Sequence, residues 1–317
     1  MTATPQSGAK TPSRERANKD APLFMWAGGK RRLIKSYMPL LEQAGRFTSY
    51  VEPFAGGAAL FDHLQTARLK AGDTVLPSAL GDANAELIGL FDAVKRDPKG
   101  LLAAIAPYEA AWANKDKAAR KTYFYALREA YWKAPTTTPQ EQLEATALLY
   151  FLMRTAFNGI WQTCQGSNGR FGTPAGLLNQ TGPVISSDTV YRWHAMLQST
   201  TLHAGGYDTI DVPDGAFVYC DPPYRDSFTT YSSGWNDKDL IGLIDWCRSL
   251  ARDKHCLVWM ANRLTEPDDG FFTQWAHDAQ KTVIPVVYTA GRRKRTDDGH
   301  EAKAATEVLL SWDGRSK

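Results

Sequence analysis

Short apolar runs alternate along the chain with longer stretches in which apolar residues recur every three or four positions. The runs are typical of buried strands, and the longer stretches are typical of amphipathic helices. Helices are predicted around 33–41 and 238–252, where apolar side chains gather on one face. Strands are predicted at 48–54, 216–220, 256–261, 283–289 and 306–312. This alternation predicts an α/β fold with a doubly wound, mostly parallel sheet and an antiparallel last strand.

The segment 95–183 differs in composition and predicted elements from the sequence on either side of it. A helical stretch dense in Ala, Tyr, Trp and Lys covers 108–133, and a second helix is predicted around 142–154. A loop rich in glycine and asparagine follows at 158–176. We interpret 95–183 as an inserted helical module within one α/β domain. The rest of that domain comprises 21–94 and 184–317.

The composition is that of a folded intracellular protein. The 317 residues are 43% hydrophobic and 22% charged, which is enough apolar material for a core. Residues 1–20 have no large apolar side chain after Met1 and are predicted to form a disordered tail. No apolar run reaches membrane-spanning length, and the start lacks a signal-peptide core. The net charge of +3 is too small to indicate a nucleic-acid partner by itself.

Neither the cysteines nor the histidines are spaced as metal ligands. The four cysteines are Cys164, Cys220, Cys247 and Cys256, and no two of them form a CxxC pair. Three of them lie in apolar or helical runs, as expected of buried free thiols in a reducing compartment. The six histidines show no ligand spacing. We therefore expect no metal site.

The first chemical motif is Asp221-Pro222-Pro223-Tyr224, directly after the predicted strand 216–220. The prolines fix φ and lack N–H groups, so Asp221 and the Pro222 carbonyl form a rigid, acceptor-rich rim. Such a rim beside the flat ring of Tyr224 suits an exocyclic amino group on a planar base. A β-turn that merely contains Asp and two prolines is the alternative. We call residues 221–224 the DPPY motif.

The second motif lies at 51–58, where a predicted strand ends in Val-Glu-Pro-Phe-Ala-Gly-Gly-Ala. Glycines that open a helix let the backbone approach a ligand closely, and the helix N-terminus presents free N–H groups. The spacing matches neither the dinucleotide fingerprint nor a P-loop. Further on, Asp82 ends a second parallel strand, a position that suits recognition of ribose hydroxyls. Alternatively, the glycines make only a tight turn and Asp82 caps the following helix.

Together these motifs resemble the Dam-like (D12) class of S-adenosylmethionine-dependent DNA adenine-N6 methyltransferases, over about residues 24–312. Trp-Ala-Gly-Gly-Lys at 26–30 is similar to the N-terminal signature of that class, and 52–57 is similar to its cofactor loop. Gly-Asp-Ala-Asn at 81–84 and Gly-Tyr-Asp at 206–208 resemble two further cofactor elements. The DPPY motif matches the catalytic motif of the class in full.

The resemblance implies a seven-stranded methyltransferase sheet, S-adenosylmethionine as cofactor and double-stranded DNA as substrate. It also implies that 95–183 is a target-recognition insert and that 228–231 belongs to a mobile substrate loop. The residues that it implies at the cofactor site are Trp26, Lys30, Phe54, Ala55, Gly56, Gly57, Asp82, Asp208 and Asp221. The catalytic residues that it implies are Asp221, Pro222, Pro223 and Tyr224. We expect a monomer or weak dimer in the cytoplasm, encoded by a bacterium or a phage.

The chain departs from this class at three places. Ala58 replaces the last glycine of the usual Phe-x-Gly-x-Gly, and as the smallest replacement it is expected to keep cofactor binding. Met25 stands where relatives that methylate GATC commonly have lysine. Those relatives also carry Tyr-Asn-Gly-x-x-Arg, where this chain has Phe157, Asn158 and Gln162. Arginine reads guanine bidentately and glutamine prefers adenine, so Asn158 and Gln162 are candidates to read DNA, and GATC is not inferred as the target.

Two further features concern DNA. A basic run between the last two predicted strands would contact DNA phosphates, and a solvated hairpin tip is its alternative. The run consists of Arg292, Arg293, Lys294 and Arg295. Trp161, in the glycine-rich loop, would either stack on a base or lie in the core.

The predicted mechanism acts on the N6 amino group of an adenine flipped out of the duplex. Hydrogen bonds from this group to Asp221 and the Pro222 carbonyl would localise its lone pair for direct methyl transfer. Tyr224 would stack on the flipped base. Methyl transfer to cytosine N4 or to a protein glutamine is an alternative, but those families typically carry Asn or Ser in place of the first Asp. A DNA-binding module without catalysis is the other alternative.

Overall fold

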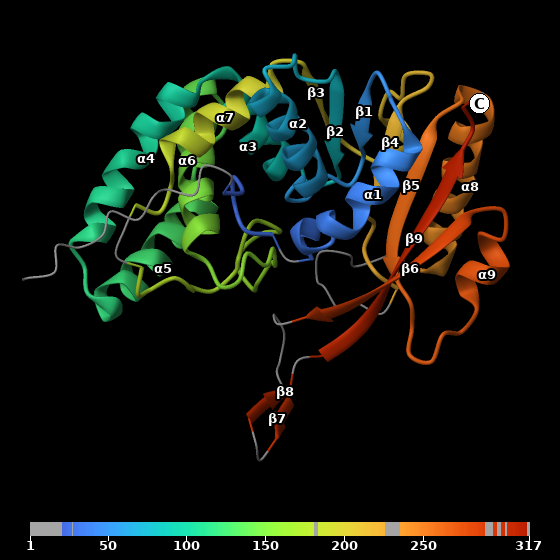
Figure 1. Cartoon of the computed structure of the whole chain (residues 1–317). Helices are drawn as coiled ribbons and strands as arrows, with labels where there is room; N and C mark the ends of the chain where they lie inside the picture. Colours follow the sequence, from blue (N-terminus) through green and yellow to red (C-terminus); the bar gives the residue numbers. More distant parts are fainter. Residues whose placement is uncertain are drawn as a thin grey trace, which may run out of the picture.

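The computed structural model (Figure 1) describes residues 21–26, 28–180, 183–225, 235–288, 294–296, 299–301 and 303–315. The predicted tail 1–20, the segment 228–231 and the residues Arg292 and Arg293 lie outside the described residues. The described residues form one large sheet with helices on both faces and, apart from it, a small two-stranded hairpin.

The large sheet has seven strands in the described part of the chain, in the order β3-β2-β1-β4-β5-β9-β6. Their bounds are β1 Tyr50–Glu52, β2 Ser78–Asp82, β3 Thr200–Ala204, β4 Phe217–Cys220, β5 Leu257–Arg263, β6 Gln280–Tyr288 and β9 Lys303–Asp313. β1 to β5 pair in parallel, and β9 runs antiparallel to its neighbours β5 and β6. The predicted fold class is confirmed. Two strands of this sheet lie outside the predicted apolar runs. β2 was expected only from the position of Asp82, and β3 is an edge strand whose side chains are mostly accessible.

Side chains of the inner strands alternate between two hydrophobic clusters, one on each face of the sheet. On β4, Phe217 and Tyr219 belong to the first cluster, and Val218 and Cys220 belong to the second. The first face is covered by α1 (Ile34–Ala44), α2 (Ala59–Ala71), α3 (Ala85–Arg96) and α7 (Ser187–Leu197). The second face is covered by α8 (Asp237–Lys254) and α9 (Phe271–Trp275) (Figure 1). Burial on both faces explains why the inner strands are continuous apolar runs.

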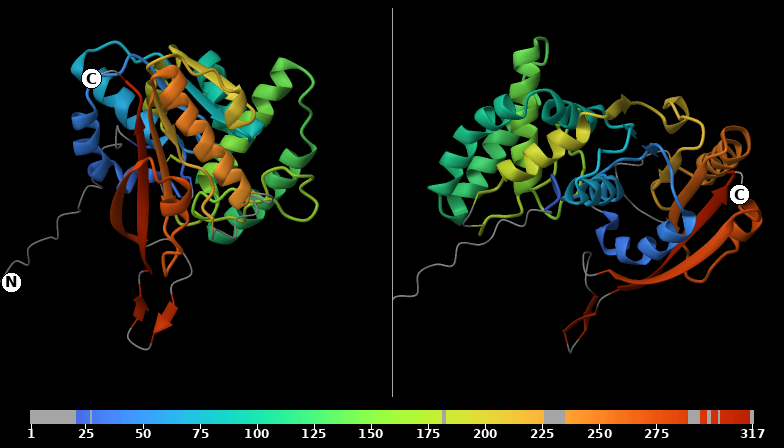
Figure 2. Two further views of the ribbon diagram at one scale, coloured as in Figure 1. Left: turned by 90° about the vertical axis from the view of Figure 1, so that its right-hand side faces the viewer. Right: turned by 45° about the horizontal axis from the view of Figure 1, so that its top comes forward.

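Three helices, α4 (Pro98–Ala113), α5 (Lys117–Lys133) and α6 (Pro139–Thr155), stand beside α3 and α7 (Figure 2). The first hydrophobic cluster continues into them. The prediction of one helix over 108–133 is wrong, because α4 ends at Ala113 and a separate helix, α5, begins at Lys117. The Asp116 side chain accepts a hydrogen bond from the Ala119 N–H and caps α5. This polar cap starts a new helix within a stretch whose composition favours a helix throughout.

The carboxyl ends of β1, β2 and β4 meet at one edge of the sheet. β1 lies between the other two, so that Val51 pairs with Ala79 on one side and with Val218 on the other. In open α/β sheets, ligands bind in the crevice at such a switch in strand order. The glycine motif, Asp82 and the DPPY motif therefore leave the sheet next to one another.

Candidate active site

A cavity of about 540 Å³ opens at this edge of the sheet. It is lined by every residue that the sequence analysis assigned to the cofactor or to catalysis. These residues are Trp26, Lys30, Phe54, Ala55, Gly56, Gly57, Asp82, Asp208, Asp221, Pro222, Pro223 and Tyr224. The structure thus brings the N-terminal signature, three strand ends and the DPPY motif to one site.

The turn after β1 fits tightly against Trp26. Gly56 has a φ of +46°, and a Cβ placed on it would lie 2.7 Å from the indole Nε1. A Cβ on Gly57 would lie 2.9 Å from the Cβ of Trp26. The rings of Phe24 and Trp161 hold Trp26 in place, each with its centroid 6.0 Å from that of Trp26. Only glycine fits at the two turn positions, because the N-terminal signature lies directly on the turn.

Asp82 holds this turn from the neighbouring strand. Its carboxylate accepts hydrogen bonds from the N–H groups of Gly56 and Asn84, both at 2.9 Å. The cap of α3 is Asn84, whose side chain accepts from two backbone N–H groups of the first helical turn. The alternative that Asp82 is the helix cap is therefore wrong. Asp82 lines the cavity and also fixes the shape of the glycine turn.

Ala58 adopts the left-handed conformation directly before α2, with φ 44° and ψ 50°. Glycine adopts this conformation freely, whereas other residues adopt it at a cost of about 1–2 kcal/mol. The glycine that is usual in the Dam-like class would therefore suit this backbone. Here the alanine methyl group is buried in the first hydrophobic cluster, and the turn still closes against Trp26.

The DPPY motif begins directly after β4, and a buried lysine contacts its first and last residues. Lys30 donates hydrogen bonds to Asp221 Oδ1 and to the Tyr224 hydroxyl, both at 2.6 Å. Burial raises the pKa of Asp221 above its usual value, and the charge of Lys30 opposes that rise. The lysine therefore stabilises the ionised carboxylate, the form that can accept hydrogen bonds from an amino group.

Glu52 is a cavity residue that the sequence analysis did not single out, although it lies in the glycine motif. It is 2% exposed, and the Tyr50 hydroxyl donates a hydrogen bond to its Oε2 at 2.8 Å. Burial raises the pKa of Glu52 to about 8; the bond from Tyr50 opposes this rise and the charge of Asp221 adds to it. The Glu52 carboxyl group is therefore protonated at neutral pH.

We expect Glu52 to make the protein less stable as pH rises from about 4.5 to about 8. The unfolded chain releases this proton near the ordinary pKa of glutamate, whereas the folded protein holds it until about pH 8. Glu52→Gln removes the linkage, so the variant should gain about 4 kcal/mol relative to wild type between pH 5 and pH 8.5. Urea unfolding of both proteins at the two pH values measures this difference. A difference between variant and wild type that does not change with pH would contradict the raised pKa.

Aromatic rings form another part of the cavity wall. Phe54 stacks on Tyr207, with ring centroids 5.5 Å apart and an interplanar angle of 27°. Trp235 meets both rings edge-on. Asp208 follows Tyr207 in a short helix, η2 (Tyr207–Thr209), and is exposed at the cavity. A flat apolar wall beside a carboxylate suits a purine ring with an exocyclic amino group. Trp235 and the Tyr207 ring were not predicted to line the site.

The loop 158–176 packs against the N-terminal signature. Trp161 is 8% exposed, and its ring lies against that of Trp26. Of the two interpretations of Trp161, the structure therefore supports the one that puts it in the core. Asn158 is exposed and Gln162 is half-buried in the same loop. They lie on either side of Trp161 in the sequence, and Trp161 lines the cavity.

The basic run is described only in part. Its last two residues, Lys294 and Arg295, lie on β7 (Lys294–Thr296), which pairs with β8 (Gly299–Glu301). This hairpin projects from the ends of β6 and β9, away from the large sheet (Figure 1). A projecting hairpin is expected in both cases: if the run contacts DNA phosphates, and if it is a solvated hairpin tip.

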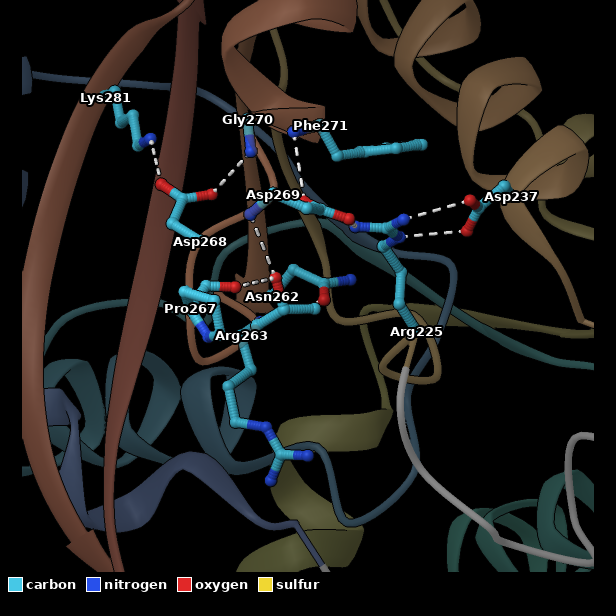
Figure 3. A network of polar contacts seen from close by, with 11 residues as sticks. Arg225, Asp237, Asn262, Arg263, Pro267, Asp268, Asp269, Gly270, Phe271 and Lys281 are labelled. Atoms are coloured by element: carbon cyan, nitrogen blue, oxygen red, sulfur yellow. Dashed lines mark hydrogen bonds and ion pairs between the residues drawn. The ribbon is translucent and has the colours of Figure 1, made fainter.

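Arg225, directly after the DPPY motif, is anchored on three sides (Figure 3). Its guanidinium donates two hydrogen bonds to Asp237, at 2.9 Å each, and two to Asp269, at 3.0 and 2.8 Å. The same group lies 3.9 Å from the ring centroid of Phe271. Asp237 begins α8 and Asp269 lies just before α9, so Arg225 fixes the end of the DPPY motif to both helices. No sequence pattern marks this residue, because its partners come from later segments of the chain.

No group of three or more His, Cys, Asp or Glu side chains in the described part of the chain could hold a metal ion. All four cysteines are free thiols, and three of them are buried. Among the described residues, no helix combines the length and apolar character that a membrane span requires.

Comparison with known proteins agrees with this geometry. The family described as D12 class N6 adenine-specific DNA methyltransferase matches residues 26–289. Type II methyltransferase M.MjaIII of Methanocaldococcus jannaschii is 27% identical over 241 residues, which cover 72% of this chain and 80% of that protein. The DNA adenine methylase of Escherichia coli K12 is 24% identical over 305 residues, which cover 93% of this chain and 96% of that protein. The DNA adenine methylase of Haemophilus influenzae is 26% identical over 257 residues, which cover 78% and 81%.

The family match includes the glycine turn, the loop 158–176 and the DPPY motif. It favours transfer to adenine N6 over the alternatives of cytosine N4, a protein glutamine and a non-catalytic module. The chain therefore belongs to the D12 class of N6 adenine-specific DNA methyltransferases.

Proposed function

We propose that this enzyme transfers a methyl group from S-adenosylmethionine to the N6 amino group of an adenine that is flipped out of double-stranded DNA. The observation that carries the proposal is the single cavity shared by the glycine turn and the DPPY motif. A cofactor held at the turn and a base held at the motif would meet inside that cavity, and such positioning is the main task of a methyltransferase.

The cavity suits S-adenosylmethionine in size and lining. Its volume of about 540 Å³ lies in the range usual for small-molecule sites. Trp26 and Phe54 offer flat surfaces, Gly56 allows close approach of the backbone, and Asp208 offers an exposed carboxylate. The remaining residues proposed to hold the cofactor are Lys30, Ala55, Gly57, Asp82 and Asp221. When bound, this cofactor supplies a methyl group on a sulfonium, a form already activated for transfer.

At the base, the DPPY motif supplies the acceptors. Asp221 and the Pro222 carbonyl would accept hydrogen bonds from the two N–H bonds of the amino group, which localises the nitrogen lone pair. Lys30 stabilises the ionised form of Asp221 and orients it through the 2.6 Å hydrogen bond. The carboxylate also stabilises the positive charge that develops on nitrogen. Pro223 keeps the turn rigid, and Tyr224 would stack on the flipped ring.

Target recognition is proposed for the segment 95–183. Its loop reaches the cavity through Trp161, while Asn158 is exposed beside it. We propose that Asn158 and Gln162 read bases there. The basic run, Arg292 to Arg295, is proposed to contact DNA phosphates without reading sequence, which fits the projection of its hairpin.

The relatives and the site support a proposal for the cellular setting. Similar methyltransferases come from bacteria, from an archaeon and from a virus of Chlorella. One chain supplies all the residues proposed for the cofactor and for catalysis. We therefore propose a monomer or weak dimer that acts on DNA in the cytoplasm of its host.

Two measurements test the proposed function together. Expression in a host without adenine methylation, followed by single-molecule sequencing, should reveal N6-methyladenine in one short sequence context. Titration calorimetry with S-adenosylmethionine should show saturable binding without DNA. Labelled methyl groups that enter protein or cytosine, with none on adenine, would refute the proposal.

A further inference from the structure

We propose that Glu307 is a positioning residue that holds the ring of Tyr224 in place for the flipped base. The proposal rests on the function proposed above. The Tyr224 hydroxyl donates a hydrogen bond to Glu307 Oε1 at 2.6 Å and accepts one from Lys30, also at 2.6 Å. The phenol is therefore tethered on two sides, to the N-terminal signature and to β9. Glu307 lies beyond residues 26–289, the part that matches the family.

Glu307 lies where a carboxyl group is costly. It is near the middle of β9, is 1% exposed and pairs in register with Arg263 on β5. Its neighbours on the same face of the strand, Ala305 and Leu309, are apolar and buried. Burying a carboxyl group costs free energy unless it is hydrogen-bonded, so packing alone would favour an apolar residue here. The bond from Tyr224 supplies a partner and ties this position to the active site.

The tether matters because stacking depends on the orientation of the ring. A tyrosine ring can swing about its side-chain bonds, whereas a flipped purine stacks well only when the two planes are nearly parallel. Hydrogen bonds at the far end of the phenol fix the ring before the base arrives. The Arg263 guanidinium lies 5.4 Å from the ring centroid, and the Lys30 ammonium lies 4.6 Å from it.

The tether also reaches the other catalytic side chain. Lys30 bonds to both Tyr224 and Asp221, so the four side chains form one chain of hydrogen bonds from Asp221 to Glu307. Loss of the acceptor at Glu307 would let the phenol shift and would loosen the lysine that orients Asp221. The expected result is a much larger loss in the chemical step than in cofactor affinity, since Lys30 keeps its own bond to Asp221.

A double-mutant cycle tests this role. Glu307→Met removes the acceptor and keeps a side chain of similar length, while Tyr224→Phe keeps the ring and removes the hydroxyl. We expect each substitution to lower kcat by about tenfold, the effect of losing one strong hydrogen bond in the transition state. Affinity for S-adenosylmethionine, measured by calorimetry, should fall far less than kcat in both. The double variant should be no slower than Tyr224→Phe, because both changes break the same bond.

Glu307→Gln is the matched control. It keeps an oxygen acceptor at the same place and should recover most of kcat. The proposal is overturned if Glu307→Met lowers kcat by the same factor in the Tyr224→Phe background as in the wild-type enzyme. Glu307 would then act by another route. It is also overturned if Tyr224→Phe retains the full kcat, a test that stands even if Glu307→Met fails to fold. A wild-type protein that methylates no DNA would instead refute the proposed function, so the two failures are distinguishable.

Discussion

Replacing Asp221 with alanine should lower the rate of methyl transfer by about a thousandfold or more, while S-adenosylmethionine still binds. The substitution removes the carboxylate proposed to accept a hydrogen bond from the amino group and to stabilise the charge that develops on it. The glycine turn stays intact, because it is held by Asp82 at the end of β2 and by Trp26 in the N-terminal signature. Incorporation of labelled methyl groups into unmethylated DNA measures the rate, and calorimetry measures cofactor binding.

The controls for Asp221→Ala separate chemistry from folding. The change takes the charge partner from the buried Lys30, and breaking such a pair costs about 3–5 kcal/mol of stability. Asp221→Asn keeps an oxygen at the site and should also lose most of the activity, with a smaller loss of stability. Asp245→Ala breaks an exposed ion pair with Arg248 on α8 and should leave methylation unchanged. A near wild-type rate for Asp221→Ala would show that the mechanism is wrong.

Gly56→Ala should have the second largest effect, a loss of cofactor affinity by about tenfold or more together with about 2–4 kcal/mol of stability. The new methyl group would meet the indole of Trp26 at 2.7 Å in a backbone with a φ of +46°. Trp26 has little room to retreat, because Phe24 and Trp161 pack against it. The turn or the N-terminal signature must therefore shift, and both line the cavity.

Gly72→Ala is the matched control for Gly56→Ala. Gly72 also has a positive φ, +77°, but a Cβ placed on it meets nothing within 4 Å. Its substitution should therefore cost only the backbone strain, about 1 kcal/mol, and leave cofactor affinity unchanged. If calorimetry and urea unfolding give the same results for the two variants, the close contact with Trp26 has no functional role.

Part of the lining of the cavity could be predicted because three of its motifs end strands, whereas Trp26 and Lys30 were expected only from the resemblance. Gly56, Asp82 and Asp221 each follow a short apolar run, and such runs are local signals. In a parallel sheet the carboxyl ends of neighbouring strands lie at one edge, so local signals were enough to bring the three residues together. Side-chain packing did not need to be known.

The partners of these residues could not be predicted, because they come from distant parts of the chain. Lys30 meets Asp221 across 191 residues, and Tyr224 meets Glu307 across 83. In the sequence, Glu307 is one charged residue in an apolar strand, a pattern equally typical of a solvent-facing position. Trp161 likewise allowed two interpretations, and only its packing on Trp26 distinguished them.

The position of β9 affects how the enzyme is made. β9 follows β6 in the chain, yet it lies between β5 and β6, and in the described sheet β6 pairs with β9 alone. A nascent polypeptide therefore cannot close this half of the sheet until β9 has left the ribosome. Glu307 arrives in the same step, so the tether of Tyr224 forms only when β9 inserts. Ribosome-bound intermediates that end before β9 would lack an interior strand and would not yet modify DNA.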